Sequence, residues 1–154
     1  MVITTLKSIY KRDLEKLGQE IGLYRDEEAI WKTDGDVTNS AGNLCLHLIG
    51  NLKHFIGATL GGSGYVRQRD LEFSTSGRPR AELLKGVDET LEVVLASLDK
   101  VTPEQLEQDY PVVVFADMGA MTTGYFLTHL ATHLSYHLGQ INYHRRLFDS
   151  ADGE

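Results

Sequence analysis

Apolar residues recur every three or four positions in four stretches of the chain, and this period predicts amphipathic α-helices. In the first stretch, lysine and glutamate fill most of the positions between the apolar residues. The second stretch follows a capping residue, Asn39 or Ser40, and ends at Gly61 and Gly62. A cap at Thr122 or Thr123 begins the last stretch, which runs to about Phe148. The predicted helices cover residues 3–28, 41–61, 80–100 and about 123–148.

The segments between the predicted helices have different characters. Residues 61–79 form a polar connection that is too long for a simple turn, so we expect it to pack against the helices and to have a role. Pro79 suits the first turn of the third helix, and Thr102 with Pro103 predicts one short helical turn after it. Residues 110–119 contain three successive valines and Pro111, which favour an extended segment lying over the helices.

Four amphipathic helices in this order predict an all-α four-helix bundle with a long connection between its second and third helices. We find no internal repeat, no low-complexity tract and no second domain pattern. The 154 residues are enough for one domain with one sizeable core. We therefore predict a single bundle domain over residues 1–154.

Composition and charge exclude several classes of partner. The formal net charge is −7 without blocks of like charge, which argues against binding to nucleic acid or to an anionic membrane surface. No apolar run approaches the ~18 residues of a membrane span, and the N-terminal residues lack a signal-peptide layout. The single cysteine, Cys45, lies in an apolar run and is interpreted as a core residue. These features predict a cytoplasmic protein.

Histidines concentrate in the last predicted helix. His129, His133 and His137 follow one another at intervals of four residues. Two imidazoles at this spacing can bind one metal ion, but His129 and His137 are separated by roughly 12 Å of helical rise and cannot share it. A helical wheel places His133 and His137 nearest the apolar face, so we predict this pair as ligands. His129 is interpreted as a supporting or packing residue.

A protein metal site needs at least a third ligand, and the second helix supplies a candidate in His47. His54 lies nearly two turns further along, and we interpret it, like His144, as a polar residue at the edge of the core. His47, His133 and His137 would form a three-histidine site with open coordination positions. The alternative is that histidines bordering the core are structural residues. No helix carries an ExxH pair, which excludes the carboxylate-rich site of a di-iron bundle.

The segments LCLHLIGNL and HLATHLSYHLGQI resemble the DinB-like (YfiT-type) superfamily of small metal-binding four-helix proteins, over nearly the whole chain. YVRQRDLEFS also resembles a poorly characterised subgroup of that superfamily. The resemblance implies a divalent metal ion, zinc or nickel, held by His47, His133 and His137. Relatives in the superfamily include S-transferases of the bacillithiol type, a mycothiol-dependent isomerase and proteins described only as metal-dependent hydrolases. Homodimers are common among them.

A three-histidine site could lower the pKa of a bound water toward ~7 or hold a low-molecular-weight thiol as its thiolate. We therefore expect a metal-dependent S-transferase or hydrolase that acts on a small molecule. The alternative is a non-catalytic bundle that is stabilised by a metal or binds a small ligand. In that case a further protein ligand, such as Asp117 or Glu28, would close the site.

Residues around the predicted site have two interpretations each. Gln140 could orient a ligand or could be a surface amide. Arg67 and Arg69 could bind a substrate carboxylate, or could pair with Asp70 and lock the long connection onto the bundle. Tyr136 is interpreted as a dimer or packing residue, as is Tyr143.

Overall fold

The computed structural model describes residues 1–150, and all regular secondary structure within them is helical. The prediction of an all-α chain is confirmed for these residues. Residues 1–150 also contain two isolated β-bridges. The elements are α1 (Val2–Gly22), the 3₁₀-helix η1 (Glu27–Trp31), α2 (Ala41–Leu52), the π-helix η2 (Lys53–Ala58), α3 (Arg69–Ser74), α4 (Arg80–Leu98), α5 (Pro103–Glu107) and α6 (Thr123–Phe148).

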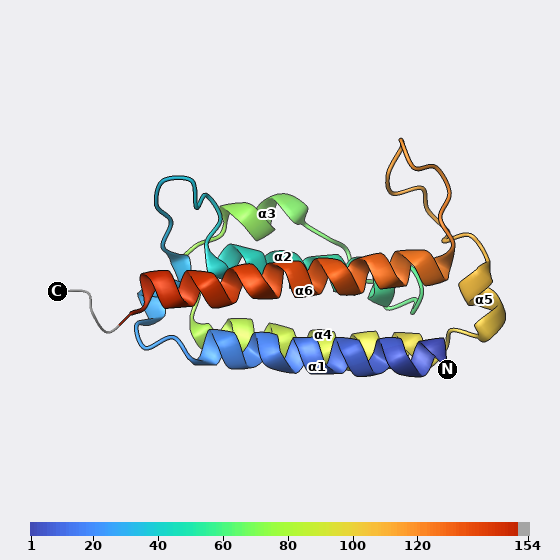
Figure 1. The fold of residues 1–154 in the computed structure, drawn as a ribbon, viewed down its shortest axis with the longest axis horizontal. Helices are drawn as coiled ribbons and strands as arrows, with labels where there is room; N and C mark the ends of the chain where they lie inside the picture. The colour runs from blue at the N-terminus through green and yellow to red at the C-terminus, as the bar shows by residue number, and fades with distance from the viewer. Residues whose placement is uncertain (151–154) are drawn as a thin grey trace.

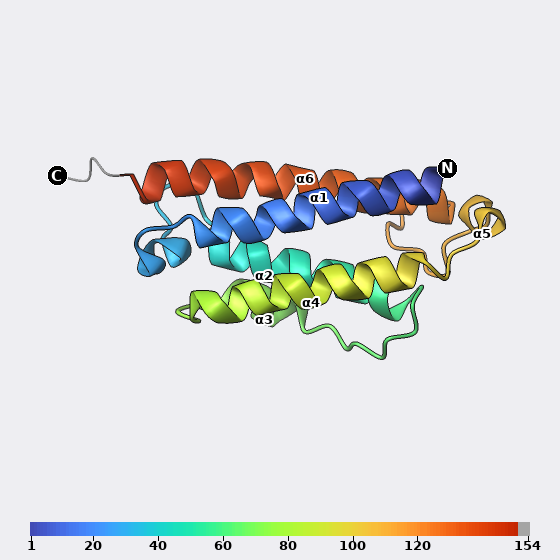
Figure 2. The same cartoon turned by 90° about the horizontal axis from the view of Figure 1, so that it is seen from below.

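The long helices α1, α2, α4 and α6 lie side by side in both views of the ribbon (Figures 1 and 2). α1 packs against α4 and α6, and α2 packs against the same two helices. The short α3 lies outside, on α2, and α5 contacts α6. This arrangement brings the helix that carries His47 next to the helix that carries the histidine row.

The apolar faces of these helices meet in one hydrophobic core. Tyr10 lies in this core, and its hydroxyl donates a hydrogen bond of 2.6 Å to the carbonyl of Leu127, which satisfies two buried polar groups. Cys45 is fully buried, as predicted, and burial raises the pKa of its thiol to about 12. The largest fully buried side chains are Tyr10, Leu14, Leu17, Ile21, Tyr24, Ile30, Leu48, Leu52, Ile56, Leu83, Leu98 and Phe126.

The first helix ends at Gly22, six residues earlier than its period predicts. The chain turns here because a residue near the other end of the sequence holds it. The Asp149 carboxylate accepts hydrogen bonds from the backbone N–H groups of Arg25 and Asp26, at 2.7 and 2.9 Å. The Asp26 side chain then caps η1 by accepting from the N–H of Glu28. A contact more than 120 residues distant in sequence therefore decides this boundary.

The second helix begins as predicted, and of the two candidate caps Ser40 is the one observed, accepting from the N–H of Asn43 at 3.1 Å. The α-helix ends at Leu52, and the chain continues as the π-helix η2 to Ala58. The predicted single helix to residue 61 is therefore wrong in its last turns. The long connection contains α3, which the sequence did not predict. At the third helix, Pro79 is the N-cap residue and not part of the first turn.

The later elements follow the predictions closely. Thr102 caps α5 in a reciprocal capping box with Gln105, and Thr122 caps α6. The segment 110–119 is not extended throughout, because the N–H groups of residues 118 and 119 both bond to the carbonyl of Phe115 in a turn. The Tyr110 hydroxyl donates to the carbonyl of Phe55 at 2.8 Å and holds the start of this segment at η2. Val112, Val113 and Met118 are exposed, and the loop before α6 projects from the helices (Figure 1), so the prediction of a segment lying over the helices is wrong for most of its length. No helix in residues 1–150 has the length and apolar character to cross a membrane.

Candidate metal centre

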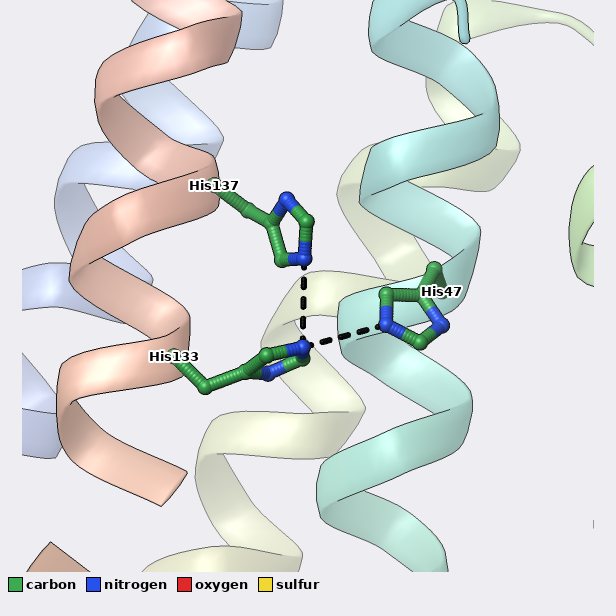
Figure 3. A group of neighbouring side chains, drawn as sticks. All are labelled: His47, His133 and His137. Carbon is green, nitrogen blue, oxygen red and sulfur yellow. Dashed lines mark hydrogen bonds between the residues drawn. The ribbon is translucent and has the colours of Figure 1, made fainter. Parts of the chain in front are cut away.

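Two neighbouring helices position three histidines around one point (Figure 3). His47 comes from α2, and His133 and His137 come from consecutive turns of α6. Buried leucines such as Leu134 and Leu138 anchor α6 in the core, so the histidine row beside them borders the gap to α2. The three histidines predicted as metal ligands are thus brought together.

The imidazole nitrogens converge closely. His133 Nε2 lies 3.2 Å from His47 Nε2 and 3.1 Å from His137 Nε2. One possible ligand atom from each of the three residues lies within 4.8 Å of the others. In a tetrahedral site with metal–nitrogen distances near 2.0–2.1 Å, ligand nitrogens are about 3.3 Å apart. The separations of His133 Nε2 from the other two nitrogens match that spacing.

The partners of the outer nitrogens decide where the protons sit. His47 Nδ1 lies 3.0 Å from Glu72 Oε1, and His137 Nδ1 lies 2.6 Å from Gln140 Oε1. Both oxygens accept hydrogen bonds, and this favours a proton on both Nδ1 atoms and lone pairs on both Nε2 atoms. These lone pairs face His133 Nε2, whose single proton could satisfy only one of them. A metal cation satisfies all three, so the residues fit a divalent metal ion.

Burial keeps His133 and His137 in their neutral form. The pKa of His133 is lowered to about 4. Burial is the largest cause, and the neighbouring His137 and His47 contribute to the same shift. Burial also lowers the pKa of His137, against an opposing contribution from its hydrogen bond with Gln140. Neutral imidazole is the form that binds metal ions, so the site is ready to do so at neutral pH.

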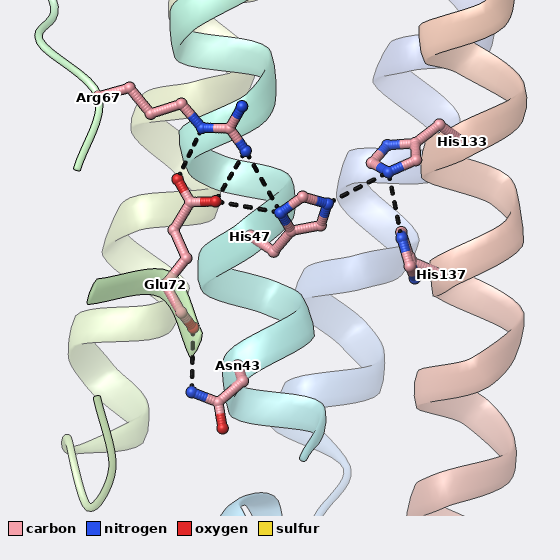
Figure 4. Close-up of polar contacts among 6 residues, drawn as sticks. All are labelled: Asn43, His47, Arg67, Glu72, His133 and His137. Carbon is pink, nitrogen blue, oxygen red and sulfur yellow. Dashed lines mark hydrogen bonds and ion pairs between the residues drawn. The ribbon is translucent and has the colours of Figure 1, made fainter. Parts of the chain in front are cut away.

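A buried ion pair lies directly behind His47 (Figure 4). Glu72 of α3 is 6% exposed, and Arg67 donates to it from Nε and Nη2, each at 2.8 Å. Burial alone would raise the pKa of Glu72, but the hydrogen bonds from Arg67 and His47 outweigh it and lower that pKa. Glu72 is therefore an ionised acceptor for both Arg67 and His47.

Arg67 and Glu72 both belong to the long connection, which is held on α2 by the contact of Glu72 with His47 and by Asn43, not by the partner predicted for Arg67. Arg67 binds Glu72, and Asp70 is not its partner. Arg69 instead lies over the ring of Phe73, at 5.2 Å from the ring centroid. The interpretation of the arginines as a loop lock is thus correct in kind for Arg67 and wrong in the acidic residue.

The remaining histidines lie outside the group. His129 packs against the rings of Phe115 and Phe126, in agreement with its interpretation as a packing residue. Both ring nitrogens of the buried His144 already have partners, the hydroxyl of Tyr24 and the carbonyl of Lys32. His54 is also separate from the group formed by the other three.

Acidic residues do not complete the ligand set in the described part of the chain. Among residues 1–150, the group of possible metal ligands contains the three histidines, and neither Asp117 nor Glu28 belongs to it. The arrangement therefore leaves coordination positions for water or a substrate.

Sequence reasoning missed Glu72, the residue most closely associated with His47. Glu72 is 25 positions from His47 and lies in a polar segment without a clear period. The only local signal is an acidic residue between Leu71 and Phe73. Asn43 was also missed as the anchor of α3, although its Nδ2 donates to the carbonyls of Glu72 and Thr75 at 3.0 and 2.7 Å.

Comparison with known proteins places the whole site inside one family. A family model described as "Protein of unknown function (DUF1572)" matches residues 3–153, so the chain belongs to this family. No curated protein and no solved structure matches the chain.

Proposed function

We propose that this member of the DUF1572 family is a divalent-metal-dependent enzyme that acts on a small molecule. His47, His133 and His137 would hold the metal ion. The observation that carries the proposal is the convergence of three Nε2 atoms, two of which are left without a proton by the partners of their rings. We further propose zinc or nickel as the metal, because both ions accept imidazole nitrogen ligands.

We also propose that the chain is related to the DinB-like superfamily and that its four long helices form the bundle of that superfamily. The side-by-side packing of α1, α2, α4 and α6 supports this relation. So does the position of the paired segments, LCLHLIGNL on α2 and HLATHLSYHLGQI on α6, which lie on adjacent helices.

The proposed chemistry is S-transfer from a low-molecular-weight thiol, or hydrolysis. A bound divalent metal would supply Lewis acidity to a water molecule or a thiol at its open positions. The chain's own residues have defined tasks. The three imidazoles supply neutral nitrogen ligands, Gln140 orients the ring of His137, and Glu72 contacts the ring of His47 from the far side.

A cavity along α6 supports a small-molecule substrate, although none of the three histidines lines it. It has a volume of about 280 Å³ and begins at Gln140, one turn beyond His137. Its walls include Leu44 of α2, Gln140 and Tyr143 of α6, and residues 36–39 of the loop before α2. Gln140 thus contacts both the cavity and a proposed ligand. This wall combines apolar side chains with a few polar groups, as small-molecule sites do.

A second candidate function is a metal that only joins two helices. The observation that favours it is that the cluster connects α2 to α6 through His47 and His133. A purely structural site should be closed by a fourth protein ligand, whereas a catalytic site keeps an exchangeable position. The experiment below separates these two functions.

The first measurement is metal content by plasma mass spectrometry on protein purified without a histidine tag. We expect about one equivalent in the wild type and in His129→Ala, which changes a histidine of the same row outside the cluster. His47→Ala and His133→Ala should lose the metal while keeping their helical circular dichroism. Absence of metal in the wild type after loading with zinc or nickel would contradict the proposal.

The second measurement tests the open position. Protein loaded with Co²⁺ should change its visible absorption when a small thiol is added, because a ligand enters the coordination sphere. Turnover in transferase screens should then require an added thiol, and turnover without one would favour hydrolysis. A spectrum that does not respond to thiol, azide or any substrate, together with complete unfolding of His133→Ala, would favour the structural metal. Sedimentation of the same samples tests the homodimer that we propose from the resemblance.

A further inference from the structure

Glu72 contacts the ring nitrogen of His47 that faces away from the other two histidines. His47 Nδ1 lies 3.0 Å from Glu72 Oε1, while His47 Nε2 points to the other two histidines (Figure 4). In neutral imidazole only one nitrogen carries the proton. A proton on Nδ1 bonds to the carboxylate and leaves Nε2 bare, whereas a proton on Nε2 would set a bare Nδ1 against the carboxylate oxygen.

Arg67 ensures that an oxygen faces His47. Its Nε and Nη2 groups each donate to one oxygen of Glu72, which holds the carboxylate in a single orientation. Arg67 Nη2, which can only donate, lies 3.3 Å from His47 Nδ1, whereas the carboxylate oxygen of Glu72, which accepts, is closer at 3.0 Å. The side chains of Arg67 and Glu72 are 12% and 7% exposed, so water competes little with this orientation.

The backbone of α2 is shaped to receive the carboxylate. A Cβ atom at Gly50 would lie 1.9 Å from Glu72 Oε2, so the glycine makes the space that the carboxylate occupies. One turn before His47, Asn43 donates to the backbone carbonyl of Glu72 and holds α3 on α2. Three independent contacts, from Arg67, Gly50 and Asn43, thus place the Glu72 carboxylate behind His47.

We propose that Glu72, oriented by Arg67, is a positioning residue that keeps His47 in the tautomer with Nδ1 protonated and Nε2 free to bind the metal. The role of the free Nε2 rests on the proposed metal site, whereas the tautomer itself does not. Hydrogen bonding of this kind behind a ligating histidine also raises its basicity and restricts its ring orientation.

Glu72→Gln distinguishes this role from simple space filling, because it preserves shape and removes one acceptor oxygen. Both oxygens of Glu72 accept from Arg67, and Oε1 also faces His47, so the amide can keep only one of the two bonds from Arg67. With its oxygen at the Oε2 position, its NH₂ group faces His47 Nδ1 and favours a proton on Nε2, whereas the opposite orientation keeps the proton on Nδ1. The variant should therefore remove the preference for one tautomer and place a proton on the nitrogen that faces His133 and His137 in a substantial fraction of the molecules.

The first readout is made on the metal-free protein. Nitrogen chemical shifts from long-range ¹H–¹⁵N spectra at pH 7.5 distinguish a protonated from a bare imidazole nitrogen. We expect His47 to be protonated on Nδ1 in the wild type and to show both tautomers, with a substantial Nε2-protonated fraction, in Glu72→Gln. Glu82→Gln, which changes an exposed glutamate paired with Arg78, is the matched control and should behave as the wild type.

The second readout is zinc affinity, measured by competition with a chromophoric chelator. Glu72→Gln should bind zinc 10–100-fold more weakly than the wild type and than Glu82→Gln, the usual effect of losing a partner behind a metal ligand. Gly50→Ala is a second variant, which keeps the charge of Glu72 but displaces its carboxylate, and it should weaken zinc binding in the same direction.

The outcomes of the two readouts are distinguishable. If His47 stays protonated on Nδ1 in Glu72→Gln, or if its zinc affinity stays within threefold of the wild type, the positioning role is wrong. If the wild type binds no zinc or nickel, the proposed function fails. The tautomer spectra of the metal-free protein then still decide whether Glu72 controls His47.

Discussion

Two glycines inside helices should respond to alanine with opposite signs, because one is packed against a buried carboxylate and the other is open. Replacing glycine by alanine in a helix interior normally stabilises a protein by about 0.5–1 kcal/mol. Gly139 on α6 is exposed, and a Cβ atom added there meets no other atom within 4 Å. Gly139→Ala should therefore raise the free energy of unfolding by about 0.5–1 kcal/mol.

Gly50 presents the opposite case. A Cβ atom there would lie 1.9 Å from Glu72 Oε2, whereas ordinary contacts begin near 3.4 Å, so the oxygen has to move by about 1.5 Å. A shift of this size breaks the 2.8 Å hydrogen bond from Arg67 Nε. Losing a buried, charge-assisted hydrogen bond costs about 1.5–3 kcal/mol, and the helix propensity of alanine offsets about 1 kcal/mol of it. Gly50→Ala should therefore lower the free energy of unfolding by about 0.5–2 kcal/mol.

Urea denaturation of the metal-free wild type and both variants measures these differences, and thermal denaturation should show a drop in Tm of roughly 1–8 °C for Gly50→Ala. A double-mutant cycle identifies the cause. In a Glu72→Ala background the collision is absent, so Gly50→Ala should become stabilising. The reasoning is refuted if Gly50→Ala is as stable as the wild type, or if its cost is the same with and without Glu72.

Three further predictions concern pH, the core and a helix cap. The pKa of His133 is about 4 in the folded protein and about 6.5 when unfolded, so the unfolded chain binds more protons between these values. The metal-free protein should thus keep its full stability above pH 6.5 and lose up to about 3 kcal/mol as the pH falls toward 4. Urea titrations at pH 7.5 and 5.0 test this, and an equal pH dependence in His133→Asn would contradict the assignment. Tyr10→Phe removes the hydrogen bond to the Leu127 carbonyl, which keeps its helical donor within α6, and should cost about 0.5–1.5 kcal/mol in the same assay, whereas a neutral effect would mean that this bond contributes no stability. Ser40→Ala removes the N-cap of α2 and should cost about 1 kcal/mol, while Ser40→Asn, which keeps a capping oxygen, should lose much less.

Interactions within one or two helical turns could be predicted from the sequence. The apolar period located the long helices. Thr102 correctly marked the start of the short α5, and Thr122, one of two candidate caps, begins α6. The spacing of four residues identified His133 and His137 as a pair on one face, because residues four apart on a helix are neighbours. His47 was selected as an edge residue of the second helix and by resemblance, and the packing of α2 beside α6 brings its ring to the pair.

Contacts between distant segments were decided by the tertiary structure alone. Glu72 contacts His47 only because α3 docks on α2, and this docking depends on Arg67, Asn43 and the space at Gly50. The end of α1 depends in the same way on Asp149, at the far end of the chain. Neither contact leaves a periodic signal, because each depends on single polar side chains that meet across the fold. The sequence by itself therefore determined the helices and the histidine pair, while tertiary packing decided which polar groups surround that pair.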